Sequence, residues 1–403
     1  MNQSVSSIPA HVPPQLVQHF AFDSQPGIDR DPPAAMDASR DSRDIVFAPQ
    51  GRRGRATWVF KRYEHIVEAF QMPEVFSSDR YSGFSQLLGE DWPMLPLEVD
   101  PPVHRLYRTF LNKVFSPLQM SRLEQGIGST VDDIVTAVLP AGSCEFQHAV
   151  ARRVPTTVFL RLMGLPLEHS DRLLEWETAL LHGATLQQRV AGARAIKNYL
   201  IDTLQERAQA PREDVVTYIA TGEVDGRPLT ADEKLGMAFV LYGAGLDTVA
   251  ATLGFTFKYL AEHPQQQREL REDPSRREKA IEEFLRYASM VVSGRTVTRD
   301  IEFHGVQLKR GDYVSLPTMF ANRDPQKFDA ARELRLDRAE PVRHVSFGAG
   351  AHTCLGAHLA RRELKIVLNA WLDRVPPFRL QPGRHAVTYG GSVFGVDSLP
   401  LAW

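Results

Sequence analysis

The longest apolar run of this chain, residues 234–260, constrains the fold more than any other feature. It reads KLGMAFVLYGAGLDTVAATLGFTFKYL and is long enough to cross a membrane as a helix. Asp247 lies at its middle, however, and an ionisable side chain at the centre of a bilayer costs about 3 kcal/mol or more. The run therefore predicts a long helix buried in a protein core rather than a membrane span.

Helical periodicity extends through most of the chain from about residue 100 to residue 290. Apolar residues recur at three- and four-residue spacing at 123–139 and at 277–290, as in amphipathic helices. The segment YEHIVEAFQM predicts a further helix. Alternating residues predict short strands in IVFAP, in ATWVFKR, in DIEFHGVQLKRGDYVSLP and near the C-terminal end. The pattern as a whole predicts a mainly α fold with small β-sheets.

The chain is expected to contain one folded domain. Residues 1–40 are rich in Pro, Ser and Asp, and we expect them to form an N-terminal surface segment. No internal repeat and no low-complexity linker divides the rest of the sequence. We therefore expect residues 41–403 to form a single compact domain.

Net charge and cysteine content bear on the partners and the compartment. The formal net charge is −2 over 403 residues, so no overall attraction to nucleic acid or to an anionic membrane is expected. The two cysteines, Cys144 and Cys354, are few for so long a chain, which fits a reducing cytosol. The stretch MNQSVSSIPAHVPPQL resembles neither a signal peptide nor a membrane anchor. These features predict a cytoplasmic protein with no nucleic-acid or membrane partner, and we expect a monomer.

Cys354 lies in the loop FGAGAHTCLG, residues 347–356, directly before a helix-like stretch. A thiolate is a nucleophile or a soft metal ligand, and the N–H groups of a helix start favour its anionic form. The glycines permit close backbone approach, and Phe347 could shield the sulfur. No second cysteine or histidine cluster completes a zinc site. Three interpretations remain: a nucleophile, a single axial ligand to a metal held in a macrocycle, and a buried structural thiol.

Small residues interrupt the long apolar helix at GAGLDT, residues 243–248. Gly243, Ala244 and Gly245 leave little side-chain bulk, so a flat group could approach the helix there. Asp247 and Thr248 place an acid and a hydroxyl at the same position. A hydroxyl inside a helix can bond a carbonyl one turn back and open the helical ladder. The alternative is a helix-packing notch with a buried aspartate that is paired elsewhere.

Two further residue pairs have the spacing of one helix face. Glu283 and Arg286 are three apart, and His104 and Arg108 are four apart. Taken singly, such pairs are more often ordinary surface residues of little energetic weight. They indicate a functional or structural site only if other features of the chain point to a ligand or a network that these pairs would bind.

The cysteine loop resembles the haem-binding loop of the cytochrome P450 family, Phe-Gly-x-Gly-x-His-x-Cys-x-Gly, at every fixed position. The likeness runs from about residue 60 to the C-terminus. The stretches GLDTV, EFHGVQLK, AHLARRE and LPLAW are most similar to the bacterial camphor-hydroxylase branch. The resemblance implies the family's triangular, mainly helical single-domain fold. It places haem between the long oxygen-binding helix and the helix that follows the cysteine.

The resemblance also implies roles for individual residues. Cys354 would be the thiolate ligand of haem b, Asp247 would relay protons, and Thr248 would stabilise the activated oxygen. The pair Glu283–Arg286 would be structural, with Arg332 or Arg335 as a possible third member. The other expected haem contacts are His104, Arg108, Arg295, Phe347, Gly348, His352 and Gly356.

The expected substrate pocket departs from the camphor branch. Trp92 stands where that branch has a tyrosine that donates to the substrate ketone, and Leu97 replaces a threonine. Ser293 replaces an acidic residue near one propionate. The pocket is therefore expected to be apolar and to suit a small terpenoid or norisoprenoid ring. Its expected lining residues are Trp92, Leu97, Leu241, Gly245, Val291 and Val393.

The implied activity is hydroxylation of an unactivated C–H bond with O2 and two electrons. No flavin or iron–sulfur segment is fused to the chain, so the electrons are expected from a two-iron ferredoxin and its NAD(P)H-dependent reductase. Arg105, Arg361 and Arg362 are expected to form a basic docking face, although each could be solvated helix surface. The alternatives are a peroxide-driven peroxygenase, a haem-thiolate binding protein without turnover, and a cysteine hydrolase that contains no haem.

Overall fold

The computed structural model describes residues 8–52, 54–338 and 342–403, and the chain divides into two compact units. The first unit comprises Met1–Ser77, Val131–Ala151 and Thr248–Trp403. The second comprises Ser78–Thr130 and Arg152–Asp247. Each unit is described by itself below.

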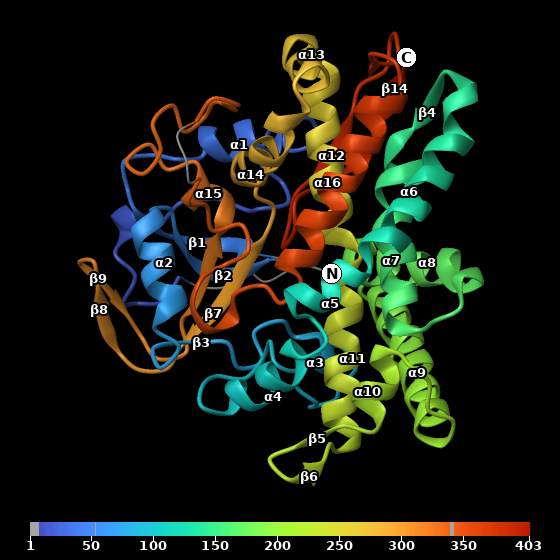
Figure 1. The fold of residues 1–403 in the computed structure, drawn as a ribbon. Helices are drawn as coiled ribbons and strands as arrows, with labels where there is room; N and C mark the ends of the chain where they lie inside the picture. The colour runs from blue at the N-terminus through green and yellow to red at the C-terminus, as the bar shows by residue number, and fades with distance from the viewer. Residues whose placement is uncertain (1–7, 53, 339–341) are drawn as a thin grey trace. The chain divides into compact units, whose positions relative to one another are not determined.

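The first unit contains most of the strands and the C-terminal helices (Figure 1). Its helices are α1 (Pro32–Ala38), α2 (Tyr63–Gln71), most of α12 (Asp247–Glu262), α13 (Pro264–Glu272), α14 (Arg277–Tyr287), α15 (Thr318–Asn322) and α16 (Ala357–Arg374), with the short helical turns η1 (Pro14–Leu16), η2 (Leu139–Ala141), η3 (Gln147–Ala151), η5 (Pro274–Arg276) and η6 (Gly350–His352). Its strands are β1 (Ile45–Arg52), β2 (Arg55–Phe60), β3 (Phe76–Ser77), β4 (Ser143–Glu145), β7 (Val292–Val297), β8 (Ile301–Phe303), β9 (Val306–Leu308), β10 (Tyr313–Pro317), β11 (Arg379–Leu380), β12 (Val387–Tyr389), β13 (Gly395–Ser398) and β14 (Pro400–Ala402).

The second unit is almost wholly helical. Its helices are α3 (Phe84–Leu87), α4 (Val103–Asn112), α5 (Pro117–Arg122), the start of α6 (Glu124–Val138), α7 (Arg153–Met163), η4 (Leu167–His169), α8 (Ser170–His182), α9 (Leu186–Gln209), α10 (Val215–Ala220) and α11 (Ala231–Gly245). The strands β5 (Glu223–Val224) and β6 (Arg227–Pro228) form a small hairpin.

A five-stranded sheet organises one part of the first unit. Its order is β1-β2-β10-β7-β3, and only the β10–β2 pair is parallel. Apolar residues of β2 lie in the core, where Trp58, Val59 and Phe60 are fully buried. Burial of such side chains contributes roughly 1.5–3 kcal/mol each to folding. Helix α2 packs near this sheet and contacts both α15 and η6, so it links the sheet to the cysteine loop (Figure 1).

The N-terminal segment is partly buried within the first unit. Phe22 and Met36 have no exposed surface, and Phe22 packs edge-on near Phe394. Asp37 accepts hydrogen bonds from the buried guanidinium of Arg323, with Nε at 3.1 Å from Oδ2. Residues 8–40 therefore do more than cover the surface, because they add apolar side chains and an ion pair to the core of this unit.

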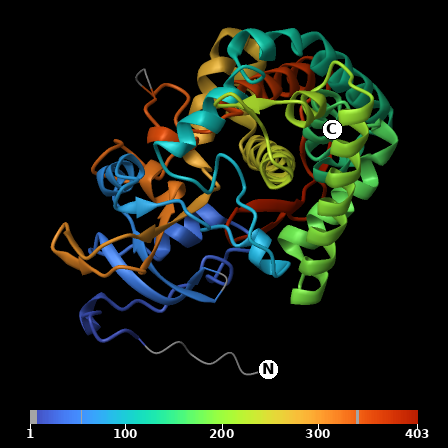
Figure 2. The same ribbon diagram turned by 90° about the horizontal axis from the view of Figure 1, so that it is seen from below.

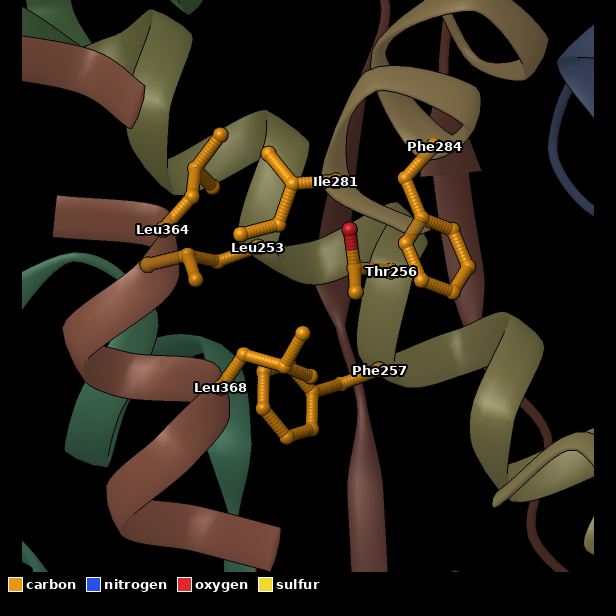
Figure 3. A pocket seen from close by; sticks show the side chains of 7 residues that line it. All are labelled: Leu253, Thr256, Phe257, Ile281, Phe284, Leu364 and Leu368. Carbon is orange, nitrogen blue, oxygen red and sulfur yellow. The ribbon is translucent and has the colours of Figure 1, made fainter. Parts of the chain in front are cut away.

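The second unit is built around antiparallel α8 and α9. Thr185 caps α9 in a reciprocal capping box with Gln188. Gly192 of α9 lets the two helices approach closely, because a Cβ there would lie 2.7 Å from the carbonyl oxygen of Trp176 on α8. Helix α11 packs against α9 and is seen nearly end-on in Figure 2.

The long apolar run forms a helix that is interrupted at one residue. Helix α11 ends at Gly245, Leu246 follows with φ −95° and ψ −54°, and α12 begins at Asp247. Among the described residues, only Ala231–Glu262 is long and apolar enough to cross a membrane, and 72% of its apolar window is buried inside the protein. The expectation of a buried core helix is confirmed.

The sequence patterns located most elements correctly. The helices expected at 63–72, 123–139 and 277–290 are α2, α6 and α14, and the expected strands appear as β1, β2 and β8 to β14. The strands β3 and β7 of the five-stranded sheet were not expected. The short strands β4, β5 and β6 inside the helical region were not expected. They are two or three residues long, so alternation has too few positions to be seen.

Candidate functional site

The cysteine loop is closed by one main-chain hydrogen bond. The N–H of Cys354 donates to the carbonyl oxygen of Phe347 at 2.8 Å. The intervening turn, η6, is preceded by Gly348 at φ 71° and begins with Gly350 at φ 72°. Side chains other than glycine rarely adopt this left-handed backbone. Glycine is therefore required at positions 348 and 350 by the left-handed backbone of the loop. Helix α16 begins three residues after the cysteine, as expected.

The three glycines of the loop serve different purposes. A Cβ on Gly350 would lie 2.5 Å from the carbonyl oxygen of Phe70, so this glycine admits the end of α2 rather than a cofactor. That corrects the expectation that all three glycines make room for a flat partner. A Cβ on Gly356 would meet no atom within 4 Å, and one on Gly348 would reach only the carbonyl of His352 at 4.0 Å. These two positions keep the open space that a planar group requires.

Cys354 is the cysteine whose surroundings fit a metal ligand. Its side chain is exposed, whereas Cys144 is half-buried in β4 and burial raises its pKa to about 12. Among the described residues, no group of three His, Cys, Asp or Glu side chains could hold a metal ion by itself. An accessible thiol can serve as the one protein ligand of a metal whose other positions are filled by a macrocycle.

The interrupted helix exposes a small residue where its neighbours are buried. Ala244 is exposed and Gly243 has open space beside its Cα, although Leu241 and Tyr242 are buried. Gly245, expected in the substrate pocket, instead faces α7, since a Cβ there would lie 3.1 Å from Phe159. The open side of the helix is therefore at 243–244, two of the three positions at which a flat group was expected to approach.

Asp247 and Thr248 follow this opening. Asp247 is buried and Thr248 is half-buried. The carboxylate of Asp247 lies 3.6 Å from Nε2 of His182. The backbone N–H of Asp247 donates a hydrogen bond to the carboxyl group of Glu177. Neither His182 nor Glu177 was expected at this position, because both come from α8, far away in the sequence.

The expected propionate partners divide between the two units. In the second unit, His104 and Arg108 lie on α4 one turn apart, as predicted; His104 is buried and Nε of Arg108 donates to Asn112 at 3.1 Å. In the first unit, Arg295 is buried on β7, where its guanidinium lies 5.3 Å from the ring centroid of Phe70. His352 is half-buried at the end of η6. Imidazole and guanidinium groups are suitable donors to carboxylates.

Trp92 is buried, but its indole N–H is already engaged. It donates to Oε2 of Glu90 at 2.6 Å, and Glu90 is also bound by Lys197 of α9. The indole ring packs against Phe239 of α11 with centroids 5.0 Å apart. Trp92 therefore presents an aromatic surface, while its N–H is engaged by Glu90.

The remaining expected pocket residues lie in both units. Val291 and Val393 face one another as an isolated antiparallel bridge in the first unit, and both are half-buried. In the second unit, Leu241 is buried on α11 and Leu97 is half-buried in the loop before α4. The structure thus brings the two valines together, and the pocket role of the set stays a prediction.

Glu283 and Arg286 form a buried network rather than a surface pair. Nε and Nη2 of Arg286 each donate to Glu283 at 2.7 Å, and both residues are fully buried on α14. The third member is Arg338, whose Nε lies 3.1 Å from Oε2 of Glu283. Arg335 contributes only its backbone N–H, at 2.9 Å, and the carbonyl of Arg332 accepts from another arginine. Both side chains considered from the sequence are therefore excluded as the third member.

Arg361 is not a free member of a basic docking face. Its Nε donates to Glu282 at 2.6 Å, and its guanidinium lies 4.5 Å from the ring centroid of Phe347. His344 also contacts Glu282, at 3.0 Å. Burial acts to raise the pKa of Glu282, but hydrogen bonds from His344 and Arg361 outweigh it and lower the pKa to about 2. Of the other two arginines, Arg105 is exposed and Arg362 is half-buried.

Comparisons with known proteins show the family of this chain. The family model described as Cytochrome P450 matches residues 184–385. The probable cytochrome P450 127A1 of Sinorhizobium fredii is 40% identical, over 98% of this chain and 97% of its own length. This chain is a cytochrome P450. Members of the family bind haem b through a cysteine thiolate, so this P450 is a haem-thiolate monooxygenase.

Solved structures confirm the mainly α fold and the likeness to the camphor-hydroxylase branch. The crystal structure of CYP101C1 has a TM-score of 0.88 and 33% identity, and covers 98% of this P450 and 99% of its own chain. That of CYP101J2 has a TM-score of 0.87 and 31% identity, with 99% of both chains covered. The steroid C26-monooxygenase of Mycolicibacterium smegmatis is 31% identical, over 85% of this P450 and 86% of its own length.

A buried acid on α16 makes the stability of the P450 depend on pH. Glu363 is fully buried, one of its oxygens has no hydrogen-bond partner in the described part of the chain, and burial raises its pKa to about 8. The folded state therefore holds a proton that the unfolded state releases above its ordinary pKa near 4.5, so unfolding becomes easier as pH rises from about 4.5 to 8.

We expect Glu363→Gln to remove this dependence. The variant should be more stable than wild type at about pH 7, by up to about 3 kcal/mol, and similar to it near pH 4.5. Urea unfolding at both pH values measures the difference. Exposed Glu278→Gln on α14 is the control, and an equal Glu363→Gln effect at both pH values would contradict the expectation.

Proposed function

We propose that this P450 hydroxylates a small apolar ring compound, of terpenoid or norisoprenoid size, with O2 and two electrons from a two-iron ferredoxin and its NAD(P)H-dependent reductase. The observation that carries the proposal is the exposed Cys354 in a loop closed by the Phe347 carbonyl. Haem, when bound, supplies the oxygen-activating chemistry. Residues 41–403 would form the haem-thiolate domain of a cytoplasmic monomer.

The roles of the individual residues follow from their surroundings. Cys354 would provide the anionic sulfur ligand. His104, Arg108, Arg295 and His352 would neutralise the haem propionates, each by donation from a nitrogen. Phe347, Gly348 and Gly356 would shape the cradle around the ligand. The two open glycine positions and the exposed thiol support this assignment.

The substrate class is proposed from the apolar character of the expected lining. Trp92 offers a ring rather than a donor, and Leu97, Leu241, Val291 and Val393 have no polar side-chain atoms. A site of this kind binds mainly by excluding water from apolar surface. Titration of the ferric protein with terpenoid hydrocarbons and ketones, followed by the change in haem spin state, tests the class. Tighter binding of acidic or strongly polar ligands would contradict it.

Asp247 and Thr248 distinguish a monooxygenase from a peroxide-driven enzyme. A peroxygenase receives both oxygen atoms and the protons from peroxide, so it has no need of an acid and a hydroxyl beside the oxygen site. A monooxygenase has to deliver two protons for each O2 it reduces. Turnover with NADH, ferredoxin and reductase should therefore exceed turnover with hydrogen peroxide as the sole oxidant.

We expect Thr248→Ala to uncouple electron use from product formation. The variant should consume NADH at a rate near that of wild type, while product formed per NADH falls about tenfold or more, because general acid–base groups typically contribute 100-fold or more. Thr256→Ala, two turns further along α12, is the matched control. Wild-type coupling in Thr248→Ala would exclude the proton-delivery role.

A further inference from the structure

A buried acid of the second unit lies beside Asp247 and has no part in the function proposed so far. Glu177 is on α8, only 6% exposed, and its Oε1 has no hydrogen-bond partner among the residues that the structure describes. A buried carboxyl group without such a partner is costly when ionised and less so when it carries a proton. Glu177 is thus placed to hold a proton.

The charged and titratable groups around Glu177 come from α11, from the start of α12 and from the residue before α7. Asp247 at the start of α12 directs both its backbone N–H and its negative charge at Glu177, and Arg152, just before α7, contributes a positive charge. Tyr242 of α11 is also nearby, but its hydroxyl donates to the carbonyl of Leu173. Burial raises the pKa of Glu177 well above its usual range, and the charge of Asp247 raises it further.

Two adjacent carboxyl groups in a buried site share a proton, because both cannot ionise together at low cost. The pair Glu177–Asp247 meets this condition within the second unit. To act as a proton store in repeated turnovers, the pair also needs a route by which a proton from water replaces the one that it has lost.

His182 provides such a route. It is the last residue of α8, its side chain is 27% exposed, and its Nε2 lies 3.6 Å from Oδ2 of Asp247. An imidazole has two ring nitrogens, so it can accept a proton on one side and donate one on the other. The groups therefore follow one another in the order solvent, His182, Asp247, Glu177.

On the basis of the proposed function, we infer that Glu177 is a proton-storing positioning residue that acts through Asp247, and that His182 returns the proton from water. Each turnover takes one O2, two electrons from the ferredoxin, two protons and one C–H substrate, and yields one alcohol and one water. When a proton is drawn from the pair, the O–H bond of Glu177 breaks, its proton passes to the Asp247 carboxylate, and Asp247 donates it onward toward the oxygen site, which leaves both carboxyl groups ionised. A proton from the imidazolium of His182 then restores the pair.

The test is the isosteric variant Glu177→Gln in the haem-loaded enzyme with NADH, ferredoxin and reductase. Glutamine keeps the shape and an acceptor for the Asp247 N–H but cannot release a proton. We expect product per NADH to fall about tenfold or more while NADH consumption persists. Glu175→Gln, at an exposed position of the same helix, should couple like wild type. His182→Gln should also lower product per NADH, because it removes the group that returns the proton from water.

A spectroscopic measurement tests proton storage without turnover. The infrared difference between wild type and Glu177→Gln should contain the C=O band of a protonated carboxylic acid at about pH 7, where an ordinary glutamate is ionised. The difference is needed because buried Glu363 contributes a similar band. If Glu177→Gln does not fold, the pH at which the wild-type bands disappear decides. Loss of both bands below about pH 5 would overturn the inference.

Failure of the inference and failure of the proposed function are distinguishable. Full coupling in Glu177→Gln, together with uncoupling in Thr248→Ala, would overturn the role of Glu177 and leave the monooxygenase assignment intact. Absence of a thiolate-type carbonyl spectrum in the wild-type protein would overturn the proposed function, whereas the infrared band of Glu177 would still report whether it stores a proton.

Discussion

Replacement of Cys354 with serine is expected to abolish both the thiolate-type spectrum and product formation. A serine hydroxyl does not ionise near neutral pH, so the anionic sulfur that pushes electron density toward O–O cleavage is lost. The reduced, carbon-monoxide-treated variant should lack the Soret band that a thiolate ligand imposes. Product formation should fall to the background of the assay.

The second cysteine supplies the matched control. Cys144→Ser removes a half-buried thiol from β4, a strand that pairs with β14 and lies in the same unit as the cysteine loop. Its carbonyl spectrum should be that of wild type. A wild-type spectrum in Cys354→Ser, or loss of the spectrum in Cys144→Ser alone, would refute the assignment of the iron ligand.

Replacement of Arg286 with alanine is expected to cause the largest loss of stability. The guanidinium is fully buried and donates to Glu283 and to the carbonyls of Asn322, Ala331 and Glu333, at 2.7–2.8 Å. Its removal leaves Glu283 buried with only part of its positive charge partners. Breaking a buried ion pair in this way costs about 3–5 kcal/mol, a large fraction of the total stability of a typical protein.

Urea unfolding and the fraction of protein that retains haem measure the effect. Arg335→Ala is the control, because that side chain is exposed on the surface and pairs with Asp337, while its backbone N–H still donates to Glu283. The control should unfold at the wild-type urea concentration. Equal midpoints for Arg286→Ala and wild type would show that the network does not stabilise the fold.

Local sequence predicted the parts of the site that are built from neighbouring residues. The loop from Phe347 to Cys354 could be predicted because its glycines occupy left-handed positions at fixed spacing. His104 and Arg108 could be placed on one helix face from their separation of four residues. The interruption at Leu246 was suggested by the glycines and the Thr248 hydroxyl beside it.

Contacts between residues distant in the sequence could not be predicted in the same way. Arg338 reaches Glu283 across 55 positions, and Lys197 reaches Glu90 across 107. Glu177 and His182 look like ordinary polar residues of an amphipathic helix until α8 is packed beside Asp247. Side-chain type alone does not identify these partners, because the tertiary fold decides which charged groups are buried together.

Under the proposed pocket role of Trp92, its hydrogen bond to Glu90 controls ligand polarity from a residue that would not itself touch the ligand. Glu90 and its partner Lys197 sit partly in solvent, yet they decide whether the indole N–H is available. A non-accepting residue at position 90 would release that N–H toward an oxygen-bearing guest. A substitution at position 90 would then change the selectivity between hydrocarbons and ketones, with every proposed aliphatic pocket residue left unaltered.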